Sequence, residues 1–254
     1  MGKKTVGSRS VNAETVQLDD IMCLDTEIYL WFPPTISGKP PSPRSGHAAA
    51  LVNDAALVVL GGKAGRKWRN DCYLLDVERW HWQLQSPAGA APAPRSYHSA
   101  TVVGRKVVVF GGNGEGDTYG DVHVLDTGTA PWSWSAPVTV GATAPCPRTG
   151  HGAVLLSDGK SILIHGGWDP DVEGDDGGPL CFSDSFVLDT DHWTWSRGPL
   201  QLASPGDADE PAARVGHALV AAANPGGGSR CWSFGGQTPG GTRDAALLLA
   251  DVSR

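Results

Sequence analysis

Short apolar runs, rather than long amphipathic segments, dominate the hydrophobic pattern of the chain. Residues 95–134 set this pattern: an alternating run is followed by a continuous apolar run, a double glycine, a second apolar run and a W-x-W segment. The continuous run at residues 107–110 combines β-branched and aromatic residues, which favours a strand buried on both faces. The stretch therefore predicts four strands, at residues 99–103, 107–110, 122–125 and 132–134.

The same series recurs along the chain with a period of about 50 residues. Each copy begins with an arginine and continues through a histidine three residues later to a double glycine; the copies start at Arg44, Arg95, Arg148 and Arg214. The first three copies also contain the W-x-W segment, whereas the fourth ends before it. Several β-rich runs within one such period are typical of a propeller blade and not of a helical solenoid.

The double glycine, the aspartate-bounded apolar run and the W-x-W segment resemble the Kelch repeat. The resemblance covers residues 20–249 and implies an all-β, Kelch-type β-propeller. We expect a flexible leader at residues 1–17 and the propeller at residues 18–254. Within it we expect a half blade at 18–40, three blades at 41–90, 91–143 and 144–210, and a partial blade at 211–254. About four to five blades are visible, with the first and last incomplete.

The two ends of the repeat series are both partial. Residues 20–25 repeat the aspartate spacing of residues 71–76, so the chain opens at the third strand of a blade, and it closes without a fourth strand. Propellers commonly build one blade from both termini, which removes exposed sheet edges. Here both ends offer a third strand, so two alternatives stand: a closed small ring, or a portion of a larger propeller.

Most repeated residues are interpreted as structural. Seven tryptophans in or beside the fourth strands should pack blade against blade, because period 2 places each pair on one face; they are Trp31, Trp80, Trp82, Trp132, Trp134, Trp193 and Trp195. The repeated arginines should bridge backbone carbonyls of the next blade. The repeated aspartates, Asp71, Asp121, Asp184 and Asp244 before the third strand and Asp76, Asp126 and Asp189 after it, should accept local backbone N–H bonds.

The repeated histidines allow two interpretations. His47, His98, His151 and His217 occupy one repeat position, so they could form a ring of metal ligands or, as we favour, hydrogen-bond between blades. His165 replaces an apolar residue before the third double glycine, and we expect it in the core or channel.

The acidic loop at residues 169–176 suggests Ca²⁺, but it lacks the spacing of a calcium loop, which favours a solvated, mobile loop.

Charge and cysteine usage narrow the function. A net charge of −7 with no basic stripe argues against nucleic-acid and anionic-membrane binding. The five cysteines show no C-x-x-C spacing, so we expect neither a zinc site nor a disulfide framework, and a reducing compartment. No apolar run is long enough for a signal or a membrane span. We therefore expect a cytoplasmic protein without a cofactor.

Non-periodic residues mark a candidate binding face. If a blade's strands are named a to d in chain order, antiparallel pairing places the b–c and d–a loops on one side of the disc. The third blade has long loops there, at residues 168–183 and 198–213. The first b–c loop is basic and contains a tryptophan, and a tyrosine replaces glycine at one rim position. The candidate residues are Arg66, Trp68, Arg69, Tyr97, Tyr119 and Trp168.

The resemblance to Kelch proteins implies a non-enzymatic scaffold that binds a protein partner through this face. The alternative from the same resemblance is a metal-dependent enzyme or specifier protein, since some Kelch-like propellers are copper radical oxidases or iron-dependent specifiers. Such proteins need a non-repeated ligand set, and none is found in the sequence. No nucleophile with an adjacent base, phosphate loop or zinc motif is found either.

Overall fold

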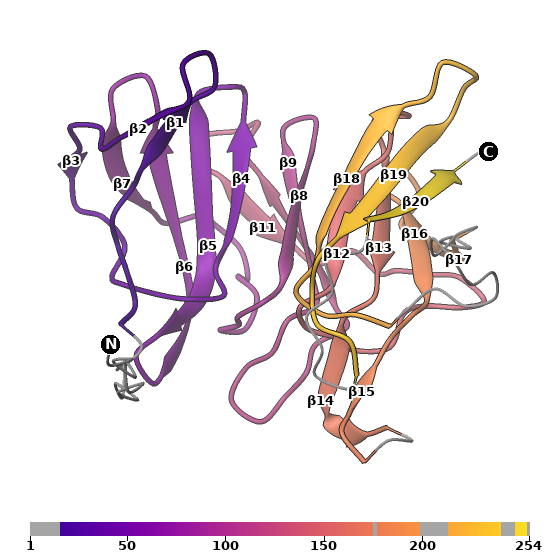
Figure 1. Ribbon diagram of the computed structural model, residues 1–254. Helices are drawn as coiled ribbons and strands as arrows, with labels where there is room; N and C mark the ends of the chain where they lie inside the picture. Colours follow the sequence, from indigo (N-terminus) through magenta and orange to yellow (C-terminus); the bar gives the residue numbers. More distant parts are fainter. Residues whose placement is uncertain (1–15, 175–176, 199–212, 240–246, 253–254) are drawn as a thin grey trace, which may run out of the picture.

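The computed structural model describes residues 16–174, 177–198, 213–239 and 247–252. In this part of the chain the regular secondary structure consists of β-strands, arranged as separate antiparallel sheets side by side in an open arc (Figure 1). The predicted all-β architecture is confirmed. No helix in these ranges has the length and apolar character that would cross a membrane.

Three sheets contain all four strands of a blade. Blade 1 consists of β4 (Ala48–Val52), β5 (Ala56–Ala64), β6 (Lys67–Asp76) and β7 (His81–Gln85), with β3 (Ser37–Gly38) added parallel to β7. Blade 2 consists of β8 (Ser99–Val103), β9 (Lys106–Phe110), β10 (Val122–Asp126) and β11 (Ser133–Ser135). Blade 3 consists of β12 (Gly152–Leu155), β13 (Ser161–His165), β16 (Ser185–Asp189) and β17 (Thr194–Arg197). Its b–c segment adds a hairpin of β14 (Trp168–Glu173) and β15 (Pro179–Cys181).

The sheets at the two ends are incomplete and do not join. The first is a hairpin of β1 (Cys23–Asp25) and β2 (Leu30–Phe32), which corresponds to strands c and d. The last contains β18 (Ala218–Ala223), β19 (Ser229–Phe234) and β20 (Leu247–Val252), which correspond to a, b and c. They lie at opposite ends of the arc in Figure 1, so the described chain is a partial propeller and not a closed ring.

Tryptophans of strand d pack blades 2 and 3 against the blade before each of them. Trp134 lies in one apolar cluster with Val58 and Leu60 of blade 1, and the Trp195 ring lies 5.2 Å from the Phe110 ring of blade 2. This confirms the expected blade-to-blade packing for blades 2 and 3. The same expectation is wrong for Trp31, which is 60% exposed, because no other sheet of the described residues covers it.

The double glycines allow the next blade to approach closely. Gly61 and Gly62 have φ of 57° and 91°, a region that glycine adopts without steric penalty. A Cβ on Gly61 would lie 2.9 Å from the carbonyl oxygen of Arg95, and the Gly62 N–H donates to that oxygen at 2.8 Å. The expected positive φ and close backbone approach are confirmed.

The repeated arginines bind within their own blade, which corrects the expectation that they bridge to the next one. Arg95 donates from Nη1 and Nη2 to the two carboxylate oxygens of Asp121, at 2.6 and 3.0 Å, and from Nη1 to the Gly111 carbonyl. Equivalent bidentate ion pairs, which we call Arg–Asp forks, join Arg44 to Asp71 and Arg148 to Asp184. These aspartates therefore pair with guanidinium groups, whereas Asp76, Asp126 and Asp189 accept backbone N–H bonds as predicted. Asp244 lies outside the described residues.

The d–a connectors add a second link between successive blades. The Ala88 N–H donates to the Trp132 carbonyl, and the Trp134 N–H donates to the Ala88 carbonyl, both at 2.7 Å. Gly89 follows in the left-handed region, where a Cβ would meet the Trp134 carbonyl. Residues 37–38 and 140–141 repeat this contact on the strands d of blades 1 and 3.

Candidate functional site

The candidate face is organised by a chain of backbone hydrogen bonds that runs from blade to blade. Tyr97 N–H donates to the Gly46 carbonyl at 2.7 Å, Gly150 N–H to the Tyr97 carbonyl at 2.9 Å, and Gly216 N–H to the Gly150 carbonyl at 2.8 Å. These residues directly precede strands a, which neighbour one another along the arc. They therefore form the inner rim on the side where, in Figure 1, the β14–β15 hairpin and the β5–β6 hairpin project.

Tyr97 stands out in this rim. Its φ is +55° and its side chain is 53% exposed, whereas the other rim positions are glycines. A bulky residue in the left-handed region is uncommon and costs on the order of 1 to 2 kcal/mol. Its ring lies close over Gly46, where a Cβ would come within 3.1 Å of the ring. The fold thus holds an exposed aromatic ring at a rim position where the other copies have glycine. Aromatic residues with positive φ also occur at the c–d turns, namely Tyr29, Trp80 and Trp193, so what distinguishes Tyr97 is its place in the rim.

Trp68 lies beside this rim, on a strand and not in the loop that the sequence predicted. Strands β5 and β6 continue into the predicted loop, so only a short turn at Gly65 and Arg66 remains. The Trp68 indole is half-buried, with the Lys63 ammonium 3.8 Å from the ring centroid. Its Nε1 donates to Ser96 Oγ of the next blade at 3.2 Å, so the indole is fixed in place.

A polar chain continues from Trp68 across blades 2 and 3. Ser96 Oγ donates to Asn113 Oδ1 at 3.1 Å, and Thr149 Oγ1 donates to the same oxygen at 3.2 Å. The sequence reasoning missed these three residues. The available signal was the hydroxyl residue that follows the repeated arginine in three of the four copies, together with the residue after the double glycine, which pairs with it.

Three other predicted residues, Tyr119, Trp168 and Arg69, contact the segments that position the rim but are not part of it. Arg95 Cζ lies over the Tyr119 ring, 4.2 Å from the ring centroid. Burial raises the pKa of the Tyr119 hydroxyl. Trp168 exchanges two backbone hydrogen bonds with Thr149, at 2.9 and 3.0 Å, and begins β14. Arg69 is half-buried, and its carbonyl accepts the Arg95 N–H at 3.0 Å. The structure therefore gathers Tyr97 and Trp68 at the rim and gives Arg69, Tyr119 and Trp168 supporting positions.

The exposed charges of this face are separated by sign. Arg66 and Lys67 are exposed on the blade 1 hairpin, and their side chains make no ion pair within the described residues. The b–c segments of blades 2 and 3 expose carboxylates instead, namely Glu115, Asp117, Asp171 and Glu173. Thr118 Oγ1 donates to Asp171 Oδ2 at 2.8 Å, which holds the two acidic segments together. The face thus has a basic end, an aromatic middle and an acidic end.

The acidic segment of blade 3, expected to be a loop, begins as a strand. Its first residues form β14, and Asp169 Oδ1 accepts the Asp171 N–H at 3.1 Å. Asp175 and Asp176 lie outside the described residues, as do residues 199–212 of the long d–a connector. The side-chain amide of Gln17, the last residue of the expected leader, donates to Ser45 Oγ and the Lys63 carbonyl and accepts the Gly65 N–H.

The repeated histidines lie between blades. His151 Nε2 lies 2.9 Å from Ser99 Oγ of the preceding blade, so the predicted inter-blade hydrogen bond is confirmed for this copy. Burial is the main cause that lowers the pKa to about 3 in three of these side chains, His98, His151 and His217. His165 is fully buried, as expected. Across the described ranges, no group of three or more His, Cys, Asp or Glu side chains is placed to hold a metal ion.

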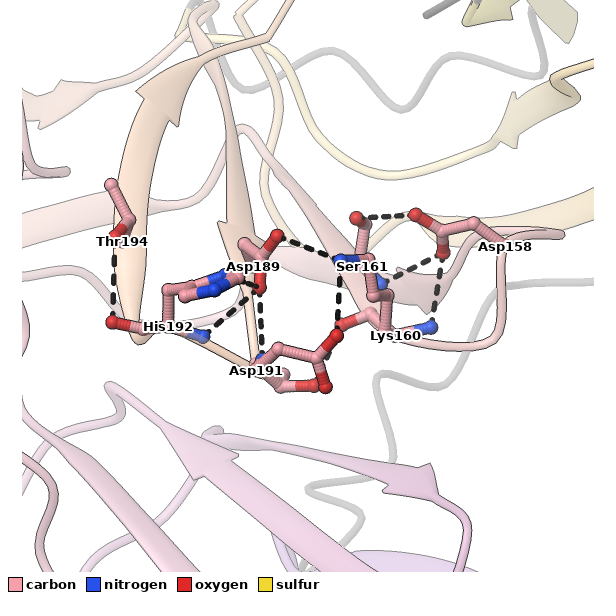
Figure 2. A network of polar contacts seen from close by, with 8 residues as sticks. Asp158, Lys160, Ser161, Asp189, Asp191, His192 and Thr194 are labelled. Carbon is pink, nitrogen blue, oxygen red and sulfur yellow. Dashed lines mark hydrogen bonds and ion pairs between the residues drawn. The ribbon is translucent and has the colours of Figure 1, made fainter.

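On the opposite face, formed by the a–b and c–d turns, charged side chains of blade 3 form ion pairs with one another. Figure 2 shows Lys160 Nζ between two carboxylates, 3.2 Å from Asp189 and 3.0 Å from Asp191, while Asp158 accepts from Ser161. A cavity of about 480 Å³ beside Lys160 is lined by residues of blades 2 and 3 on this side. The ion pairs link the a–b turn to the c–d turn of blade 3, so Lys160 and its two carboxylates are paired, unlike Arg66 and Lys67 on the candidate face.

Four-stranded sheets in an arc, joined by double glycines, Arg–Asp forks and strand-d tryptophans, define a Kelch-type β-propeller. Residues 5–236 match the model of the KLHDC2/KLHL20/DRC7 Kelch-repeats domain, so the chain belongs to the Kelch-repeat family. It is 33% identical over 192 residues to acyl-CoA-binding domain-containing protein 4 of Arabidopsis thaliana, covering 73% of this chain and 27% of that protein. It is 40% identical over 95 residues to Kelch domain-containing protein 2 of Bos taurus, covering 37% and 23%.

Host cell factor 1 of Homo sapiens is 30% identical over 208 residues, which cover 74% of this chain and 10% of that protein. The matched regions thus span only a minor part of these relatives. The relatives share the Kelch repeats with this chain, while their full lengths extend far beyond the matched region.

Proposed function

We propose that this chain is a non-enzymatic Kelch domain that binds a protein partner across the rim formed by Tyr97, Trp68 and the b–c segments. The observation that carries the proposal is Tyr97, an exposed aromatic ring held in a left-handed backbone conformation where the other copies have glycine. Tyrosine and tryptophan are enriched at interface hot spots, where they bury much area at little entropic cost. Kelch domains commonly bind proteins, which supports the same proposal.

The charges of the rim indicate the chemistry of the partner. A segment that crosses the rim from blade 1 to blade 3 passes Arg66 and Lys67 first, then Tyr97, and then the carboxylates around Asp117 and Glu173. Complementary charge on a partner would be acidic at the first end and basic at the second, with an apolar or aromatic side chain between them. Such pairing fixes the direction of the bound segment.

The proposal also places the protein in the cytoplasm. Cys23, Cys72 and Cys146 are free thiols, and Cys72 is buried. Free thiols are typical of a reducing compartment. Fractionation of cells that express the tagged chain tests this part, and recovery mainly in a membrane or secreted fraction would contradict it.

The decisive variant is Tyr97→Gly, because it restores the residue that the other copies use and so preserves the backbone. Its matched control is Tyr29→Gly, which removes another tyrosine in the left-handed region, with φ +54° and 79% exposure, from a c–d turn on the opposite face. Partners captured from cell lysate by the wild-type chain are identified and then titrated against both variants. Loss of a hot-spot side chain costs about 2 kcal/mol, so Tyr97→Gly should weaken binding roughly thirtyfold.

Tyr29→Gly should bind as the wild type does. Equal affinities of the two variants would contradict the proposed face. A charge reversal, Arg66→Glu with Lys67→Glu, should lower affinity further at low salt than at high salt, because exposed charges are screened. An effect that is independent of salt would refute the charge assignment while leaving the aromatic contact in place.

A further inference from the structure

The cavity of about 480 Å³ between blades 2 and 3, which we call the inter-blade cavity, is walled by the a–b and c–d turns of both blades. In each wall a threonine of the c–d turn is bound to the a–b turn. The N–H and Oγ1 of Thr127 donate to the Arg105 carbonyl at 3.0 and 2.7 Å. Those of Thr190 donate to the Lys160 carbonyl at 3.2 and 2.7 Å. Arg105 and Lys160 therefore occupy the same position in successive blades, and both line the cavity.

Lys160 is neutralised by carboxylates of its own blade, whereas the arginine of blade 2 is not. Lys160 Nζ lies 3.2 Å from Asp189 Oδ2 and 3.0 Å from Asp191 Oδ2 (Figure 2). Strand register places Asp126 of blade 2 at the position of Asp189, so Gly128 stands at the position of Asp191. Asp126 Oδ1 accepts the Gly128 N–H at 2.7 Å, and no ion pair joins this carboxylate to a cation within the described residues. A glycine thus replaces the second carboxylate in blade 2.

A second cation follows the arginine of blade 2. Lys106 lines the cavity next to Arg105, where blade 3 has Ser161 and blade 1 has Ala55 and Ala56 at the two positions. Both cations are exposed, and neither side chain makes an ion pair in the part of the chain that the structure describes. The basic pair is therefore specific to blade 2, because the other complete blades form the same turn without it.

The rest of the lining combines an apolar wall with carboxylates. Trp193 is half-buried and packs with Val103 on the apolar cluster that contains Val108, and all three residues line the cavity. Asp126 and Asp191 are its two carboxylates, and Asp191 is already paired with a lysine. Three cations against two carboxylates favour an anion, in a chain whose net charge is −7. An apolar wall with a few convergent polar groups, in a cavity of this size, is typical of a small-molecule site.

We propose that the inter-blade cavity binds a small phosphorylated compound with a planar ring, of the nucleoside monophosphate class. Arg105 and Lys106 donate to the phosphate, because a guanidinium fork and an ammonium are the usual phosphate-binding groups. The ring stacks on Trp193, as bases stack on aromatic side chains. The oxygens of Asp126 accept from the sugar hydroxyls. The cavity lies on the face opposite the rim, so this proposal does not depend on the rim or on its partner.

Isothermal titration calorimetry of the whole chain tests the proposal. The probes are the 5′-monophosphates of adenosine, guanosine, cytidine and uridine, with inorganic phosphate and the four nucleosides as partial ligands. At least one nucleotide should bind one-to-one, roughly tenfold or more tightly than inorganic phosphate or its own nucleoside, because only the nucleotide uses both the cations and the apolar wall.

The variant Arg105→Ala with Lys106→Ala locates the site. It introduces the residues that blade 1 has at both positions, so thermal melts should match the wild type. Nucleotide binding should weaken by roughly tenfold or more, since charge-assisted hydrogen bonds to the phosphate are lost. The matched control is Arg66→Ala with Lys67→Ala, which removes two adjacent exposed cations from the other face and should leave the affinity unchanged.

Three results would overturn the proposal. The first is that none of the four nucleotides binds at millimolar concentration. The second is that inorganic phosphate binds as tightly as every nucleotide, because the apolar wall would then contribute nothing. The third is an equal loss of affinity in the two double variants, because binding would then follow the overall charge of the chain and not the inter-blade cavity.

Discussion

The packing of blade on blade is tested by removing the same repeat tryptophan in two environments. Trp134 is 6% exposed between blades 1 and 2, whereas Trp31 is 60% exposed on the first sheet. A fully enclosed indole buries roughly 200 Å², worth about 5 kcal/mol at about 25 cal/mol per Å². The two indoles differ by about half of that area, so Trp134→Ala should cost roughly 2 to 3 kcal/mol more than Trp31→Ala.

The absolute loss for Trp134→Ala should be about 3 to 5 kcal/mol, because a cavity remains where the ring was. For a chain of this length each kcal/mol lowers the melting temperature by roughly 2 to 4 °C, so the shift should be on the order of 10 °C. Thermal melts followed by far-UV circular dichroism measure both variants at the same protein concentration. Equal shifts for the two variants would refute the reasoning that burial by the preceding blade stabilises this position.

Three further predictions concern the links between and within blades. Asp184→Asn removes the charge that balances the buried Arg148 guanidinium, and urea denaturation should show a loss of about 2 kcal/mol or more. Gly89→Ala should destabilise more than Gly104→Ala in the same assay, because both have positive φ but only the first Cβ meets a carbonyl, that of Trp134; equal losses would contradict the close approach. The free energy of unfolding should fall as the pH drops from 7 to 5. The pKa is about 3 in the folded chain for His98, His151 and His217, so these side chains stay neutral there, whereas in the unfolded chain they take up protons below the ordinary histidine pKa of about 6.5. The expected loss is about 2 kcal/mol per residue at pH 5. A urea midpoint that is unchanged between pH 7 and pH 5 would contradict this assignment.

The repeat made most of the architecture predictable from sequence. Strand positions, the double glycines and the tryptophans of complete blades follow from local rules, because each copy places the same residue types at the same spacing. Trp31 was predicted wrongly since its burial depends on a neighbouring blade and not on its own sequence. The arginine forks were placed on the wrong blade because spacing shows that Arg95 and Asp121 recur together, but not which carbonyl or carboxylate lies within reach.

The candidate site was less predictable because it is made of contacts between copies. Tyr97 was found from sequence, since it breaks the repeat at a glycine position. Trp68 was identified, yet its half-buried state required knowledge that β5 and β6 continue through the expected loop. The Ser96–Asn113–Thr149 chain depends on atoms of two blades meeting at about 3 Å, and no periodic pattern within one copy encodes that distance.

Hydrogen exchange of the chain, alone and in complex with a captured partner, tests the proposed binding face most directly. We predict slower exchange in the complex for residues 63–69, 113–119 and 168–173 of the b–c segments. The turns at residues 103–106, 126–129 and 157–161 on the opposite face should exchange at unchanged rates. Protection of these turns, with no change in the b–c segments, would contradict the assignment of the rim around Tyr97 as the partner-binding surface.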